Sequence, residues 1–365
     1  MINKNKIYLV AEIGVNHNGS IKLAKSMIHA AKKYGADAVK FQAFRAKDIA
    51  LVNTSKAKYQ KNKSNKKETQ YQMLKKYELQ YESFIDLKRY AKSLNIDFFL
   101  TASDSISLRF IVETLKSKII KIGSGDLTNI GLLHRLGSYK KKIILSTGMS
   151  TFSDIDIALS AISHGYLKLQ GEFSLKKHQK LYKKNLKYLK ANVTLLHCTT
   201  EYPAPTNELN LNIIDSMKNE YGLNIGYSDH SCNLLTPIIA MGKGINLIEV
   251  HLTSNNNLSG PDHKSSLNYS NFKKYVNNIR STEKSLGSFR KKITVSEKNN
   301  FLNVQKSLVF SKDLNIGDKI TPDNLTAKRV GKGISAQHYF EFIGKSVTRN
   351  IKKDMLVNKK LILRK

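Results

Sequence analysis

Eight short apolar runs rich in β-branched residues alternate with longer segments of helical periodicity, and this alternation constrains the fold more than any other feature of the chain. The runs begin at Ile7, Ala36, Ile96, Ile119, Lys142, Val193, Asn224 and Ile245. The segment SIKLAKSMIHAAKKYG, after the first run, has apolar residues at three- and four-residue intervals and ends at a glycine. Eight such alternations in roughly 260 residues predict an α/β fold, the (β/α)8 TIM barrel. A doubly wound sheet is the alternative, but it usually has fewer strands.

Each apolar run ends in a polar or glycine-rich tip. In a TIM barrel the C-terminal ends of all strands converge on one face, where the active sites of this fold are built. Residues two apart, such as Lys40 and Gln42, point to the same side of their strand. The sequence therefore predicts a polar site on that face, lined by Glu12, Asn16, Lys40, Gln42, Thr101, Lys121, Ser124, Ser146, Thr200, His230 and His251.

The seventh and eighth runs end in GYSDH and LIEVH, which places His230 and His251 on neighbouring strands within reach of one ion. Imidazole suits divalent transition metals, and two protein ligands leave coordination positions free for substrate and water. We expect a divalent metal here, with Asp229 or Glu249 orienting the histidines. The alternative is that each histidine is satisfied by ordinary hydrogen bonds.

Lys40 and Lys121 lie inside the apolar runs AVKFQ and IIKIGSG. Most of the 61 lysines and arginines must be solvated surface groups. An ammonium group buried in a strand without an anionic partner is costly, so these two lysines predict an anionic ligand at the barrel face.

The excess of 61 basic over 28 acidic residues gives a net charge of +33. The lysines are scattered along the chain without an arginine–aromatic module, so we expect only weak, unspecific binding to nucleic acid. No apolar run approaches the length of a membrane span, and the first residues lack a signal-peptide pattern. Cys198 and Cys232 form no disulfide framework. These features predict a cytoplasmic protein without a membrane partner.

The chain after the eighth strand changes in character. We expect the barrel to span residues 1–287, a polar linker 288–303, and a small β-rich domain 304–365 that contains turn signals such as IGD and PDN. A lysine-rich stretch, Arg45 to Lys67, is predicted to be a mobile loop over the barrel mouth.

The strand-tip motifs AEIGVNHNGS, AVKFQAF, KIGSG, ILSTGM, LLHCTTEYPAP, GYSDHS and GPDHKSSL resemble, in order, those of the sialic acid synthase family. The tail DLNIGDKITPDNLTAKRVGKGIS resembles that family's C-terminal antifreeze-like (SAF, β-clip) domain. The resemblance implies metal-dependent condensation of phosphoenolpyruvate with an open-chain N-acyl amino sugar, giving a nine-carbon 2-keto sugar acid and phosphate. It also implies a divalent metal, usually Mn²⁺ with Mg²⁺ or Co²⁺ as alternatives, and a domain-swapped homodimer.

The resemblance further implies a role for each tip residue. His230 and His251 would hold the metal. The phosphoenolpyruvate would be bound by Lys40, Thr101, Lys121, Ser124 and Ser146, and the catalytic set would be Glu12, Lys40, Lys121 and Asp262. Glu12 would handle the proton of the water that adds to C2. Sugar recognition would fall to Gln42, Asp126, Tyr202 and Asp262, with Arg329 reaching the N-acyl group from the other subunit.

Several substrates and classes compete. We first expect N-acetylmannosamine as the sugar substrate, which gives N-acetylneuraminate. The segments KAKYQKN and CTTEYPAP also resemble legionaminate synthases, which use 2,4-diacetamido-2,4,6-trideoxymannose. The motif GPDHK argues against a pseudaminate synthase. Asp126 stands where the family usually has Glu, and Val330 where it has Pro. A Schiff-base aldolase would need a desolvated lysine and no metal pair, and a carbohydrate-binding protein on an inactive barrel would lack the tip residues.

Overall fold

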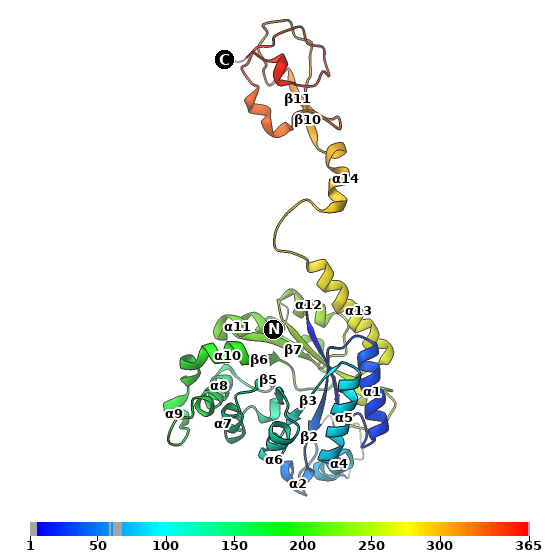
Figure 1. The fold of residues 1–365 in the computed structure, drawn as a ribbon, viewed down its shortest axis with the longest axis vertical. Helices are drawn as coiled ribbons and strands as arrows, with labels where there is room; N and C mark the ends of the chain where they lie inside the picture. Colours follow the sequence, from blue (N-terminus) through cyan, green and yellow to red (C-terminus); the bar gives the residue numbers. More distant parts are fainter. Residues whose placement is uncertain (1–5, 58–59, 61–67, 364–365) are drawn as a thin grey trace. The chain divides into compact units, whose positions relative to one another are not determined.

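The computed structural model describes residues 6–57, 60 and 68–363, and the chain divides into two compact units, residues 1–287 and 288–365 (Figure 1). Among the described residues, no helix is sufficiently long and apolar to cross a membrane.

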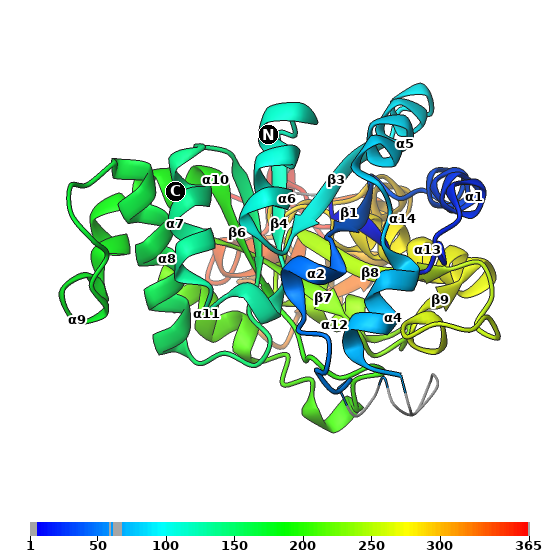
Figure 2. The ribbon, with the colours of Figure 1, turned by 90° about the horizontal axis from the view of Figure 1, so that it is seen from below.

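Unit 1 contains a closed barrel of eight parallel strands, with helices on its outside (Figure 2). Each strand pairs with the next, and β1 pairs with β8, which closes the barrel. Every predicted run is a strand, so the TIM barrel is confirmed and the doubly wound sheet is excluded. The strands are β1 (Tyr8–Gly14), β2 (Ala38–Ala43), β3 (Asp97–Ala102), β4 (Ile119–Ile122), β5 (Lys142–Ser146), β6 (Val193–His197), β7 (Asn224–Asp229) and β8 (Leu247–Thr253).

The connecting helices begin where the sequence supplies caps. The Ser20 side chain accepts from the backbone of Leu23 at the start of α1, and Thr151 forms a capping box with Asp154 at the start of α8. The longer helices are α1 (Ile21–Lys33), α4 (Gln70–Tyr77), α5 (Tyr81–Ser93), α7 (Ile130–Ser138), α8 (Phe152–Leu167), α10 (Leu186–Asn192), α11 (Ile213–Tyr221), α12 (Thr236–Gly242) and α13 (Tyr269–Leu286). The shorter elements are α2 (Ala46–Ile49), α6 (Ser105–Arg109), η1 (Phe110–Thr114), η2 (Ser124–Asp126), α9 (Leu175–His178), η3 (Leu181–Asn185), η4 (Thr206–Glu208), η5 (His263–Ser265) and β9 (Leu267–Asn268).

The inside of the barrel is filled in layers. An apolar layer near the N-terminal ends of the strands consists of Val10, Ala38, Phe99, Ile144, Leu196 and Leu247. Because successive strand residues alternate in direction, the next inward positions on these strands lie two residues further along, and they are polar: Glu12, Lys40, Thr101, Ser146 and Glu249, with Cys198 directly after β6. The apolar layer fills the barrel on the N-terminal side of the polar layer. The polar layer therefore forms the bottom of the site at the C-terminal face.

Two glycines let the helices α7 and α8 approach backbone to backbone. A Cβ atom on Gly137 would lie 2.0 Å from the carbonyl oxygen of Ile162, and one on Gly165 would lie 1.8 Å from the carbonyl oxygen of His134. Any larger residue at either position would force the two helices apart.

The stretch from Arg45 to Lys67, predicted to be a loop, contains α2 at its beginning. Residues 58–59 and 61–67 of that stretch lie outside the described residues.

Unit 2 contains a helix that the sequence analysis did not expect. The segment 288–303, predicted to be a polar linker, includes most of α14 (Val295–Val304). Thr294 and Glu297 form a capping box at the start of this helix. The helix is polar, and a polar segment between two domains has the composition of a linker. Strands β10 (Lys306–Phe310) and β11 (Leu325–Arg329) then pair antiparallel, followed by η6 (Ala336–Glu341) and η7 (Lys359–Leu361). The core of the unit includes Leu308, Phe310, Ile320, Val347 and Ile351.

Candidate active site

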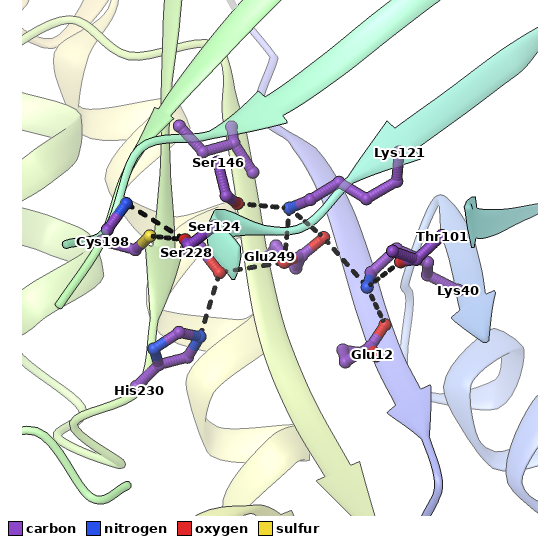
Figure 3. A network of polar contacts seen from close by, with 12 residues as sticks. Glu12, Lys40, Thr101, Lys121, Ser124, Ser146, Cys198, Ser228, His230 and Glu249 are labelled. Carbon is purple, nitrogen blue, oxygen red and sulfur yellow. Dashed lines mark hydrogen bonds and ion pairs between the residues drawn. The ribbon is translucent and has the colours of Figure 1, made fainter. Parts of the chain in front are cut away.

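The polar layer gathers side chains from β1, β2, β3, β5 and β8 at the C-terminal face of the barrel, and Figure 3 shows them directed toward one another. Lys40 of β2 is buried and forms an ion pair of 2.7 Å with Glu12 of β1. Its ammonium group also donates to Thr101 at 2.9 Å and lies 3.8 Å from Glu249. Gln42, two residues further along β2, donates to Glu12 at 3.3 Å. Lys40 is thus held between two carboxylates.

Lys121 of β4 reaches across the barrel to Glu249 of β8. Its ammonium nitrogen lies 2.9 and 3.1 Å from the two carboxylate oxygens, and it donates to Ser146 at 2.6 Å (Figure 3). Glu249 also accepts a hydrogen bond from Ser228 at 2.9 Å. The two lysines and two glutamates form one buried cluster, which is electrically balanced when both glutamates are ionised. Removing one member of such a cluster leaves an uncompensated buried charge.

The pKa values of the two carboxyl groups in the cluster are shifted in opposite directions. Burial raises the pKa of Glu12 to about 7, against the opposing effect of Lys40. Burial acts on Glu249 in the same direction, but Lys121 and Lys40 outweigh it and hold the pKa of Glu249 below its usual range. At neutral pH Glu249 is therefore an anion, whereas Glu12 can take up or release a proton.

The two histidines lie on neighbouring strand ends, with ring centroids 5.5 Å apart and rings inclined at 75°. His230 Nδ1 donates to the carbonyl oxygen of Thr199 at 2.7 Å, which leaves Nε2 as the nitrogen with a lone pair. Burial lowers the pKa of His230, and burial together with His230 lowers that of His251, so both rings are neutral. His251 Nδ1 lies 3.9 Å from a carboxylate oxygen of Asp262.

This histidine pair fits a divalent cation. Metal ligation needs neutral imidazole, and His251 Nδ1 is buried without a hydrogen-bond partner among the residues that the structure describes. Nowhere in those residues do three or more His, Cys, Asp or Glu side chains converge on one point. The protein would therefore supply two ligands, and water or substrate would complete the coordination.

Asp229 does not belong to this site, although the sequence left open whether it or Glu249 supports the histidines. Its carboxylate accepts from Thr236 at 2.6 Å, from Tyr275 at 2.8 Å, and from the backbone and side chain of Ser231 at 2.9 and 2.6 Å. Strand alternation could have found this, because an inward His230 requires an outward Asp229. The same alternation places Ser228 inward, a residue that the sequence analysis missed.

A group of hydroxyl and thiol side chains surrounds Gly148, just beyond β5. Ser124 Oγ accepts from the Gly148 backbone N–H at 3.0 Å and lies 3.2 Å from Cys198 Sγ. A Cβ atom on Gly148 would lie 2.1 Å from Thr200 Oγ1. That hydroxyl oxygen is buried and makes no hydrogen bond to any described residue. These donors next to Lys121 are suited to an anionic oxygen.

Two of the residues assigned to the sugar, Tyr202 and Asp126, lie in connecting segments beyond the strand ends. The Tyr202 ring packs against His230 with centroids 4.2 Å apart and against His251 with centroids 5.6 Å apart. Asp126 lies in η2, and burial raises its pKa to about 6 against a hydrogen bond from Asn129. Arg329 is at the exposed end of β11 in unit 2.

A TIM barrel whose C-terminal face holds two buried lysine–glutamate ion pairs beside a neutral histidine pair is typical of an enzyme active site. A model described as the NeuB family matches residues 27–291, and one described as the SAF domain matches residues 305–362. This chain therefore belongs to the NeuB family, and the predicted resemblance is confirmed over both units.

Similar proteins span nearly the full chain. An N,N'-diacetyllegionaminic acid synthase of Campylobacter jejuni is 42% identical over 352 residues, which cover 96% of this chain and 99% of that protein. A protein of the same name from Legionella pneumophila is 36% identical, covering 94% and 91%. The crystal structure of an N-acetylneuraminic acid synthetase from Leptospira borgpetersenii, in complex with citrate, is 29% identical with a TM-score of 0.65, covering 82% and 91%. Because these relatives are synthases, this chain is an enzyme.

Proposed function

We propose that the chain is an N,N'-diacetyllegionaminate synthase, which condenses phosphoenolpyruvate with 2,4-diacetamido-2,4,6-trideoxymannose and releases phosphate. The observation that carries the reaction class is the buried cluster of Lys40 and Lys121 beside the histidine pair. The two relatives at 42% and 36% identity favour this sugar over N-acetylmannosamine, our first expectation. N-acetylneuraminate synthesis is the second candidate, supported by the likeness to the Leptospira enzyme.

Phosphoenolpyruvate would bind at the polar layer. Lys40 and Lys121 supply two charges, and the hydroxyl groups of Thr101, Ser124 and Ser146 supply hydrogen bonds from neighbouring strand ends. In the free protein the two glutamates hold the lysine side chains in place, so the lysines are already positioned before phosphoenolpyruvate binds. The bound anion would then compete with the glutamates for the lysines.

His230 and His251 would hold a divalent cation, for which Mn²⁺ is our first choice and Mg²⁺ or Co²⁺ the alternatives. When bound, the cation supplies a Lewis acid for the aldehyde carbonyl of the sugar. The hydrogen bond from His230 Nδ1 to the Thr199 carbonyl oxygen leaves Nε2 free to bind the cation. The Tyr202 ring restricts the space in front of both imidazoles.

Glu12 would handle the proton of the second step. In the first step the π electrons of C2=C3 of phosphoenolpyruvate form the bond from C3 to the aldehyde carbon, the aldehyde oxygen becomes an alkoxide, and positive charge is left at C2. Water then adds to C2 and loses a proton, which offsets the proton that the alkoxide takes up to become a hydroxyl group. The resulting hemiketal phosphate breaks its C2–O bond to phosphate, and its hydroxyl proton leaves with the phosphate, giving the 2-keto acid. A carboxyl group with a pKa of about 7 can accept the proton of the water at neutral pH, and Glu12 is the group in the cluster that meets this condition.

The assembly would be a domain-swapped homodimer. The loops and helix starts that follow β3, β5 and β7 expose large apolar side chains, namely Ile106, Met149, Phe152, Leu235 and Ile239. Exposed apolar groups on the loops of the face that carries a polar site suit a covering surface. Unit 2 of a second copy, with Arg329 directed at the N-acyl group, would provide this covering surface.

A mixture of the Arg329→Ala and His251→Ala proteins tests the domain swap. Reassembled mixed dimers should regain one intact site, whereas sites built from one chain would regain none.

The experiment that tests the function measures phosphate release from phosphoenolpyruvate by purified protein with Mn²⁺. The three arms contain 2,4-diacetamido-2,4,6-trideoxymannose, N-acetylmannosamine or no sugar. We expect release with the first sugar alone, abolished by a chelator and by Lys121→Gln but retained in Lys118→Gln, a change at an exposed lysine directly before β4. Release with N-acetylmannosamine alone would support the second candidate, and silence from folded, metal-loaded protein would overturn both.

A further inference from the structure

The loop after β1 is tied to the loop between β8 and α13 by buried side chains. Asn16 is almost fully buried, and its amide nitrogen donates to the Leu252 carbonyl oxygen and to Ser266 Oγ, each at 2.8 Å. Ser266 Oγ in turn donates to the carbonyl oxygen of Asp262 at 2.6 Å. A continuous chain of hydrogen bonds therefore runs from the first strand end to the backbone of Asp262.

A second tie joins the same two loops. Asn18 donates from its amide nitrogen to the Ser259 carbonyl oxygen at 3.0 Å, and its amide oxygen lies 3.0 Å from His263 Nε2. His263 is fully buried, and its Nδ1 lies 2.7 Å from Thr253 Oγ1. Both ring nitrogens of a neutral His263 are thus satisfied, Nε2 as donor and Nδ1 as acceptor. A Cβ atom on Gly260 would lie 2.7 Å from the His263 ring, so the loop closes tightly over it.

We propose that Asn16 and His263 are positioning residues that hold Asp262 beside His251 and thereby set the affinity for the amino sugar. Asp262 sits in an irregular segment, where backbone hydrogen bonds to a rigid neighbour decide its orientation. Its carboxylate faces His251 and contributes to the charge environment of Lys40. The motif VNHNG, which the proposed function does not otherwise use, supplies the rigid neighbour. This inference rests on the proposed function, in which Asp262 contacts the sugar.

The Asn16→Asp variant tests the tie, because it keeps the size of the side chain and removes both N–H donors. With wild-type protein active in the phosphate assay, the KM for the amino sugar should rise roughly tenfold, as expected for loss of buried hydrogen bonds. The KM for phosphoenolpyruvate should stay unchanged, since no lysine of the cluster is touched. Asn257→Asp is the matched control, the same change at an exposed position of the same loop, and it should leave both constants unchanged.

A double-mutant cycle shows whether the effect passes through Asp262. If it does, Asn16→Asp should add almost nothing in an Asp262→Asn background, because the group being positioned is already altered. His263→Gln, which keeps one amide donor toward Asn18, should be milder than His263→Ala. Equal rises in both KM values, or independent multiplication of the two single effects, would reduce Asn16 to a structural role and overturn the proposal.

Amide hydrogen exchange without substrate separates this inference from the proposed function. Asn16→Asp should speed exchange in residues 254–266 and leave residues 119–146, on the opposite part of the barrel, unchanged. Wild-type protein that releases phosphate with neither sugar would overturn the proposed function, and exchange would still decide whether the tie exists. Equal acceleration in both segments would overturn the tie itself.

Discussion

The ammonium nitrogen of Lys121 contacts both carboxylate oxygens of Glu249, at 2.9 and 3.1 Å, in the buried centre of the barrel. The same carboxylate lies 3.8 Å from Lys40. Together with Glu12, which lies 2.7 Å from Lys40, Glu249 therefore offsets the charge of the two buried lysines when no anionic substrate is bound.

Replacing Glu249 by Gln should destabilise the free protein by about 3 kcal/mol, because it leaves buried positive charge without its partner. Phosphoenolpyruvate should then raise the unfolding temperature of Glu249→Gln more than that of the wild type, since the ligand replaces the missing anion. Urea unfolding and thermal scans with and without ligand measure both effects. Glu172→Gln, at an exposed position, serves as control and should stay within about 0.5 kcal/mol of the wild type. An unchanged free energy of unfolding in Glu249→Gln would contradict the balance described here.

Asp229→Asn should lower the free energy of unfolding by about 2 kcal/mol or more, since the carboxylate accepts charge-assisted hydrogen bonds from Thr236, Ser231 and Tyr275. Tyr275→Phe removes one of these bonds and should cost about 1 kcal/mol. The KM for phosphoenolpyruvate of the folded Asp229→Asn protein should match the wild type. A protein of normal stability with impaired phosphoenolpyruvate binding would mean that Asp229 faces the site after all.

Gly148→Ala should raise the KM for phosphoenolpyruvate at least roughly tenfold, because the new methyl group displaces the hydroxyls of Thr200 and Ser124 that lie 2.1 and 2.9 Å from its position. Steady-state kinetics at saturating sugar measures this. Gly131→Ala in α7 is the matched control. Its Cβ meets nothing within 4 Å, so the protein should gain up to about 1 kcal/mol of stability and keep its kinetics. Equal KM values in the two variants would refute the crowding argument.

Asp37 should stabilise the protein at neutral pH and lose this effect in acid. Burial alone would raise its pKa, but hydrogen bonds from the Leu9 backbone, Lys6 and Arg280 outweigh it, so the pKa lies below its usual value. A lowered folded-state pKa means that the stabilisation is complete above about pH 4, the unfolded value, and disappears as the pH falls through the folded one. The difference in unfolding free energy between the wild type and Asp37→Asn should therefore shrink below pH 4. A difference that is constant from pH 7 to pH 3 would show that the charge of Asp37 is irrelevant.

The barrel and the inward positions of its strands followed from the sequence. The runs around Lys40, Lys121 and His251 are apolar except at their tips, and strand alternation fixes which side each tip faces. The turn signals of unit 2 predicted a small β-rich domain. The helix α14 was missed because its polar composition resembles that of a linker, and only its capping box marks it as a helix.

The partners of the inward groups were decided by the tertiary structure. Lys121 and Glu249 are 128 residues apart and meet across the barrel, and Asn16 reaches Ser266 only because β8 closes against β1. The local pattern of a strand sets the direction of a side chain, because it depends on the alternation of the backbone alone. The group that the side chain meets depends on barrel closure and on the competition of nearby charges, neither of which a strand encodes by itself.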